Sequence, residues 1–110
     1  MDHSDRRANP RYPLTLEVEY TVLRGNGVGQ TGFGRTINIS ARGVLLDISD
    51  PPRQGLIQLS IYWPFFRHRS IRLKLLMYGE IVRVVGNWVA VRVTGHTFYT
   101  TGHDQKRGQQ

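Results

Sequence analysis

Apolar and polar side chains alternate with a period of two along much of this chain, and this pattern restricts its fold more than any other feature. From Leu14 to Val22 every second residue is apolar, and the residues between them are threonine or glutamate. The same alternation recurs in residues 57–63 and 71–75. A period of two is typical of a strand with one buried face, and no segment has the three- and four-residue apolar spacing of an amphipathic helix. The sequence therefore predicts an all-β fold with little or no helix.

Glycine, proline and asparagine mark the breaks between the expected strands. Residues 24–34 contain five glycines and no run of strand-forming side chains, so we predict a flexible loop there. Short strands are expected at 35–39 and 43–48, after which Asp50-Pro51-Pro52 breaks the chain. Residues 63–70, WPFFRHRS, are expected to connect two strands, with their aromatic side chains either capping the core or forming a docking surface.

The last predicted strands form a hairpin. Gly86-Asn87 is typical of a two-residue turn between strands at 80–85 and 88–93. The alternation loses its phase near Gly79, which predicts a bulge or a sharp bend at that point. The two strands are therefore expected to pair antiparallel.

The domain organisation follows from the length and from the distribution of apolar residues. The 110 residues allow one domain with a modest core. Roughly six locally connected strands indicate a small antiparallel barrel or sandwich, and closure into a barrel would remove exposed edges. We assign residues 1–13 to a flexible N-terminal arm, 14–95 to the β-domain and 96–110 to a polar C-terminal tail.

Arginine dominates the charged residues. The formal net charge is +7, and 13 of the 15 basic residues are arginine. A guanidinium group grips phosphate with two parallel hydrogen bonds and stacks on flat rings, whereas a lysine ammonium offers a point charge. The bias favours an anionic partner that carries phosphates. The alternative is that it reflects only a genome rich in G and C.

The absence of cysteine and of long apolar runs limits the class of protein. Without cysteine, disulfides, thiolate metal sites and cysteine nucleophiles are excluded. No apolar run approaches the ~20 residues that span a bilayer, and the N-terminus lacks the apolar segment of a signal peptide. These features predict a soluble protein in the cytoplasm.

Three arginines lie close together before the first strand. Arg6, Arg7 and Arg11 belong to a short polar segment, in which Pro10 biases Asn9 toward an extended conformation. Such a cationic arm can fold over a compact anionic ligand, so that Arg7 and Arg11 reach the ligand together. The alternative is a solvated, charged leader that binds nothing.

A second polar motif, NISARG, lies between the two short central strands. If Ile37 and Ile39 face the core, Asn38 and Ser40 lie together on the outer face, where two hydrogen-bonding side chains can read the edge of a base. Gly43 allows a positive φ or a close approach of the backbone. The alternative is an ordinary turn between strands.

Together the two motifs resemble the PilZ domain family. The resemblance consists of an RxxxR pair at Arg7 and Arg11, followed by a [DN]xSxxG motif at Asn38, Ser40 and Gly43. It covers nearly all of the chain that is expected to be ordered. Either motif alone is common in proteins, whereas both motifs in this order and at this spacing are specific.

The resemblance implies a six-stranded antiparallel β-barrel of the PilZ type that binds the bacterial second messenger cyclic di-GMP on its outer surface. Arg7 and Arg11 would contact the phosphates and the guanine faces. Asn38 and Ser40 would hydrogen-bond guanine or phosphate, and Gly43 would let the backbone approach the ligand. Binding is expected to order the arm and to change the surface that an effector protein recognises. The implied role is a receptor or adaptor that regulates motility, exopolysaccharide synthesis or biofilm formation, and not an enzyme.

Two arginines distinguish this chain from the common pattern of the family. Arg42 stands where a second glycine is frequent, and we expect it to add a contact to the anionic ligand rather than to block the site. Arg6 directly precedes the RxxxR pair. It favours a stacked dimer of cyclic di-GMP over a single molecule, because another guanidinium can hold a second guanine.

Other functional classes give weaker interpretations of the same residues. A small basic β-barrel can bind single-stranded nucleic acid, but the arginines are concentrated in the arm and are not spread over one sheet face. A PilZ-like adaptor that binds no ligand is the other alternative, and the intact RxxxR and NxSxxG residues argue against it. The four histidines are scattered and form no metal-binding spacing, so neither a metal nor a cofactor is expected.

Overall fold

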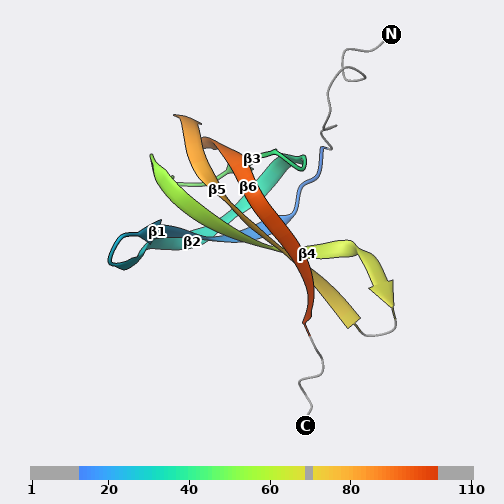
Figure 1. Ribbon diagram of the computed structural model, residues 1–110. Coiled ribbons are helices and arrows are strands. Elements are labelled where there is room, and N and C mark those ends of the chain that lie inside the picture. The colour runs from blue at the N-terminus through green and yellow to red at the C-terminus, as the bar shows by residue number, and fades with distance from the viewer. Residues whose placement is uncertain (1–12, 69–70, 102–110) are drawn as a thin grey trace.

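The computed structural model describes residues 13–68 and 71–101 of the chain (Figure 1). Its six strands, in chain order, are β1 (Glu17–Arg24), β2 (Gly27–Ile39), β3 (Gly43–Asp47), β4 (Gly55–His68), β5 (Ile71–Val85) and β6 (Trp88–Thr101). All neighbouring strands are antiparallel, and the sheet closes in the order β1-β2-β3-β6-β5-β4. The described residues contain no helix. The predicted all-β fold, a six-stranded antiparallel barrel, is therefore confirmed.

Strand β1 closes the barrel because it pairs along both of its edges. Tyr20 lies opposite Gly32 of β2 and also opposite Leu59 of β4. Neither edge of β1 is therefore left open between Val18 and Thr21, and backbone groups that would otherwise be exposed are used in the ladder.

Alternate side chains of the strands point inward and form one core. In β4, for example, Ile57, Leu59 and Ile61 are fully buried. Burial of a side chain of this size contributes about 1.5–3 kcal/mol, so the alternation seen in the sequence is a main source of stability. The buried apolar residues are Val18, Tyr20, Val22, Ile39, Val44, Leu46, Ile48, Ile57, Leu59, Ile61, Leu75, Met77, Ile81, Val89, Val91 and Val93.

The glycine-rich segment is part of a β-hairpin, so the prediction of a flexible loop at 24–34 is wrong. The turn consists only of Gly25-Asn26, and the residues after it pair with β1. A Cβ on Gly32 would lie 2.8 Å from Oη of Tyr20. Glycine at this position therefore makes room for a side chain of the neighbouring strand and does not interrupt the ladder.

Three strands continue beyond the closed part of the barrel (Figure 1). Strand β4 reaches His68 and β6 reaches Thr101, with β5 paired to both. Most of the predicted connection at 63–70 is therefore strand, and the predicted tail at 96–110 begins inside β6. At the other end, the ladder of β1 begins at Glu17 and not at the predicted start of the alternation.

Two local predictions in the β5–β6 hairpin are confirmed. Val85 pairs with Trp88 across the turn Gly86-Asn87, where Gly86 has a φ of 60°. The register shifts by one residue between Tyr78 and Gly79. The loss of apolar phase near Gly79 therefore corresponds to an irregularity of the ladder, as predicted.

Replacing Gly79 by alanine is expected to destabilise the barrel by about 1–3 kcal/mol. An added Cβ would lie against the Arg92 carbonyl oxygen and 2.7 Å from Cγ1 of Val91. Gly95 on the facing strand has nothing within 4 Å of the equivalent position, so Gly95→Ala is the matched control. Urea denaturation measures both variants, and equal stabilities would contradict the packing role of Gly79.

Candidate ligand-binding site

The chain enters the barrel through a hydrogen-bonded clamp on β2. The hydroxyl of buried Thr36 donates to the carbonyl of Leu14 and accepts a hydrogen bond from the N–H of Leu16. The N–H of Thr36 donates to the Leu16 carbonyl at 2.8 Å. A buried hydroxyl that both donates and accepts hydrogen bonds fixes the positions of the backbone groups to which it is bonded. The segment from Leu14 to Leu16 is therefore held beside β2 at Thr36, which lies two residues before Asn38 in the chain.

The NISARG segment forms a tight turn around Ser40. Ser40 is 7% exposed, and its hydroxyl accepts hydrogen bonds from the N–H groups of Arg42 at 3.3 Å and Gly43 at 3.0 Å. The same hydroxyl donates to the Gly43 carbonyl at 3.1 Å. Contrary to the prediction, Ser40 does not stand exposed beside Asn38. Its hydrogen-bonding capacity shapes the turn instead.

A β-bulge at Ile37 changes which residues of β2 face the core. Thr36 pairs with Leu46 and Asn38 pairs with Leu45, so Ile37 has no partner of its own on β3. Among residues 36–39, Thr36 and Ile39 are buried and Ile37 is only partly buried. The prediction that Ile39 faces the core is therefore confirmed, and the same prediction for Ile37 is wrong. The extra residue bends the strand and turns Asn38 outward.

Asn38 and the turn line a shallow hollow on the outside of the barrel, which we call the outer groove. Its volume is about 230 Å³. The strand register places Asn38, Leu45 and Ala90 in one row across β2, β3 and β6. The lining residues are Asn38, Arg42, Gly43, Val44, Leu45, Val82, Ala90, Val91 and Arg92. The groove thus combines an apolar floor with polar and cationic borders.

Two arginines border the outer groove in different electrostatic states. Arg42 is exposed and forms no ion pair with any residue in the described ranges. Arg92 is paired with the Glu80 carboxylate on β5. An anion in the groove would therefore meet one guanidinium that is already available and a second that is partly neutralised.

Gly43 is not required by the fold. Its φ is not in the positive region that favours glycine. The predicted alternative of a positive φ at Gly43 is therefore wrong, and the close approach of the backbone remains. An added Cβ would make only ordinary contacts, 3.6 Å from the Val91 carbonyl oxygen and 3.8 Å from Oγ of Ser40. The bare backbone of Gly43 leaves space beside the groove that a ligand can use.

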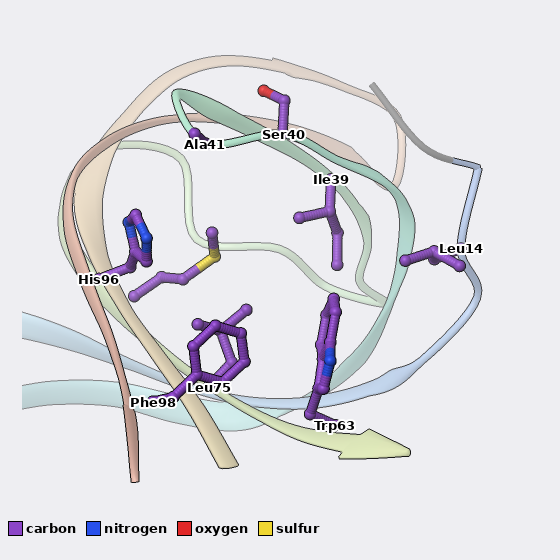
Figure 2. Close-up of a pocket in the computed structure, with 9 residues that line it drawn as sticks. Leu14, Ile39, Ser40, Ala41, Trp63, Leu75, His96 and Phe98 are labelled. Atoms are coloured by element: carbon purple, nitrogen blue, oxygen red, sulfur yellow. The ribbon is translucent and has the colours of Figure 1, made fainter. Parts of the chain in front are cut away.

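A second, apolar cavity lies at the end of the barrel behind the turn (Figure 2). Its volume is about 400 Å³, and Leu14, Ile39, Ser40, Ala41, Trp63, Leu75, Met77, His96 and Phe98 line it. Figure 2 shows Oγ of Ser40 pointing away from the cavity. Trp63 packs against the core and makes an edge-to-face contact with Phe98, with ring centroids 5.5 Å apart. For Trp63, this placement supports the capping interpretation of the aromatic segment.

The first residues of the β-domain lie beside the NISARG turn. Leu14 lies three residues after Arg11, and it lines the same cavity as Ser40 and Ala41 of the turn. Arg6, Arg7 and Arg11 themselves lie outside the described residues. The structure therefore places the root of the arm, but not its arginines, beside the turn.

Sequence reasoning missed the floor of the outer groove. Leu45 and Ala90 come from strands far apart in the chain, and they become neighbours because β3 pairs with β6. The alternation around each residue indicates an outward position, but it does not say which strands are adjacent.

Other kinds of site are not found in the described part of the chain. It contains no group of three or more histidine, aspartate or glutamate residues arranged to hold a metal ion. It also contains no helix with the length and hydropathy needed to cross a membrane.

Comparison with known proteins gives one result. The family model for the PilZ domain matches residues 5–104, a range that covers nearly the whole chain and includes both motifs. No curated protein and no solved structure matches the chain significantly.

Replacing Ser40 by alanine is expected to lower the free energy of unfolding by about 1 kcal/mol, because the N–H of Gly43 loses its acceptor in a partly buried turn. Ser49→Ala is the matched control, since Ser49 is exposed and surface changes usually stay within about 0.5 kcal/mol. Chemical denaturation followed by circular dichroism measures both variants. A Ser40→Ala variant as stable as the Ser49→Ala variant would show that the hydroxyl does not hold the turn.

Proposed function

The chain belongs to the PilZ domain family, and on that premise we propose that it is a receptor for cyclic di-GMP that acts on an effector protein in the bacterial cytoplasm. PilZ domains are binding and adaptor domains and are not typical enzymes. The proposed ligand is the family's own, and the proposed output is control of motility, exopolysaccharide synthesis or biofilm formation.

The observation that carries the proposal is the position of the arm's root. Arg11 lies three residues before Leu14, and an extended chain spans at most about 3.5 Å per residue, so their Cα atoms are within about 11 Å. Leu14 is fixed to Thr36 and lies beside the Ser40 turn. This tether supports a role for Arg11 near the turn, whose Arg42 and Gly43 border the outer groove.

The groove alone is too small for a cyclic dinucleotide. Its volume of about 230 Å³ is below the ~300–1,000 Å³ of typical small-molecule pockets. A second wall is needed to enclose the ligand, and the arm of residues 1–13 is the segment proposed to supply it. The bound ligand would thus hold the arm against the barrel, and the resulting change of surface would alter binding to the effector.

The chemistry around the groove fits a guanine nucleotide. Leu45 and Ala90 offer an apolar floor to a flat purine, Asn38 offers both a donor and an acceptor, and Arg42 offers a guanidinium to phosphate or to guanine. Gly43 permits close approach of the ligand to the backbone. We further propose that Arg6 holds a second guanine, so that the ligand binds as a stacked dimer.

Replacing Arg7 or Arg11 by alanine is expected to weaken cyclic di-GMP binding about tenfold or more, because a hydrogen bond to a charged group contributes about 1.5–3 kcal/mol. The free energy of unfolding should change by no more than about 0.5 kcal/mol, since arginine side chains are almost never fully buried. Isothermal titration calorimetry measures the affinity, with Arg53→Ala as a control at an exposed position. Wild-type affinity in both variants would show that the arm does not contact the ligand.

Replacing Gly43 by alanine separates a role in binding from a role in folding. The added Cβ makes only ordinary contacts, and the substitution restricts the unfolded chain, so stability should stay the same or rise by up to about 1 kcal/mol. Affinity for cyclic di-GMP should fall about tenfold, which corresponds to ~1.4 kcal/mol. A stable variant with wild-type affinity would show that the ligand does not approach this backbone.

Calorimetric titration with cyclic di-GMP, with GTP and single-stranded RNA as competitors, tests the function itself. Saturable binding that neither competitor displaces supports the receptor, and two ligands per chain would support the stacked dimer. Salt-sensitive binding to RNA without binding to cyclic di-GMP would favour the basic-barrel alternative. No binding to any of the three would leave an adaptor that uses no ligand.

A further inference from the structure

The end of β6 has one strand edge that no described residue covers. β3 pairs with β6 from Trp88 to Arg92, and the N–H of Val93 donates to the Arg42 carbonyl. On the opposite edge, pairing with β5 continues to Thr101. Within the described ranges, residues 94–101 therefore offer backbone N–H and C=O groups along one side, where Figure 1 shows β6 extending beyond the barrel.

Apart from the bulge at Thr94, its first residue, this edge lacks the usual protection against pairing with another chain. Residues 94–101, TGHTFYTT, contain no proline and no lysine, arginine or acidic residue, and they are rich in threonine and aromatic residues that favour strands. Natural edge strands are usually blocked by charge, proline or a bulge. An exposed, neutral edge of this length is therefore suited to forming further backbone hydrogen bonds.

The other two uncovered edges are less suited to pairing. β4 beyond Ile61 is not paired with β1, but that part of β4 contains Pro64, which cannot donate a ladder hydrogen bond, and Arg67. β2 before Arg35 is not paired with β3, but it is rich in glycine, which weakens a strand and its register. Among the three, the β6 edge has the strongest strand-forming sequence.

We propose that residues 94–101 pair antiparallel with the same residues of a second copy, forming a symmetric dimer through a continuous β-sheet. An antiparallel edge is complementary to itself under a two-fold axis. With Gly95 opposite Thr101 of the partner, Phe98 lies on the axis opposite its own copy, and Thr97 lies opposite the partner's Tyr99. In this register, Phe98 faces Phe98 of the partner on one face of the sheet, and Thr97 faces the partner's Tyr99 on the other face.

The net charge opposes association of two copies over most of the surface, so the neutral, partly apolar edge is where a second copy can approach. The chain carries a formal net charge of +7, so two copies repel each other over much of their surface, whereas residues 94–101 carry no formal charge with histidine neutral. Phe98 is 46% exposed and packs against Trp63 beside the apolar cavity. Pairing at Phe98 would extend this apolar face into the partner. Residues 102–110 contain no apolar side chain that could cover it.

Sedimentation velocity of the 110-residue chain over a concentration series, without nucleotide, tests the proposal. The wild type should form a dimer. The double variant Thr97→Lys/Tyr99→Lys should be monomeric, because it places two pairs of like charges opposite each other near the axis. Both side chains are exposed in the single chain, so circular dichroism and the thermal midpoint of the variant should match those of the wild type.

Two further samples make the outcome specific. Val28→Lys/Phe33→Lys adds the same charge on β2, where both residues are exposed, and this variant should remain dimeric. An equal mixture of the Lys/Lys variant and a Thr97→Glu/Tyr99→Glu variant should restore the dimer as a heterodimer. A wild type that stays monomeric at all concentrations, or a dimer that the Lys/Lys change leaves intact, would overturn the proposal.

Discussion

The pairing of β1 with both β2 and β4 is the constraint on which the rest of this structure depends. Because that pairing closes the sheet, every strand must send alternate side chains into one interior, and the remaining side chains must face outward. The outer row of Asn38, Leu45 and Ala90 runs across three neighbouring strands, because β3 pairs with both β2 and β6. A closed core of this kind is rigid, so residues placed on its outside keep fixed relative positions.

The candidate site lies where the regular ladder is interrupted. The bulge at Ile37 turns Asn38 outward, and a second irregularity between Ile81 and Arg83 lies beside Val82 at the other border of the groove. Bulges often accompany binding sites because they redirect a side chain without breaking the sheet. Two buried hydroxyls also position parts of the site: that of Thr36 holds Leu14 at the root of the arm, and that of Ser40 holds the turn. These side chains thus contribute to the proposed function by positioning other groups.

Much of the fold could be predicted from the sequence, because a period of two directly reports one buried face. The predicted Gly86-Asn87 turn and the irregularity at Gly79 are both present. The loop predicted at 24–34 was wrong because glycine beside Tyr20 makes room for a side chain, and sequence alone does not distinguish this from a turn. The site was predicted as two separate motifs. The bulge at Ile37 and the floor of the groove depend on contacts between distant strands, which local patterns do not contain. The role of Ser40 is local, since its partners are Arg42 and Gly43, and it corresponds to the alternative of an ordinary turn between strands.

The central claim is that cyclic di-GMP binds on the outside of the barrel, between the arm and the outer groove. Amide chemical shifts of the isotope-labelled 110-residue chain, recorded during titration with cyclic di-GMP, test it most directly. The account predicts that the largest changes fall on Asn38 to Gly43, on Ala90 to Arg92 and on the arm, with little change along β1. Changes confined to the barrel-end cavity or to the edge of β6, or no changes at saturating ligand, would contradict it.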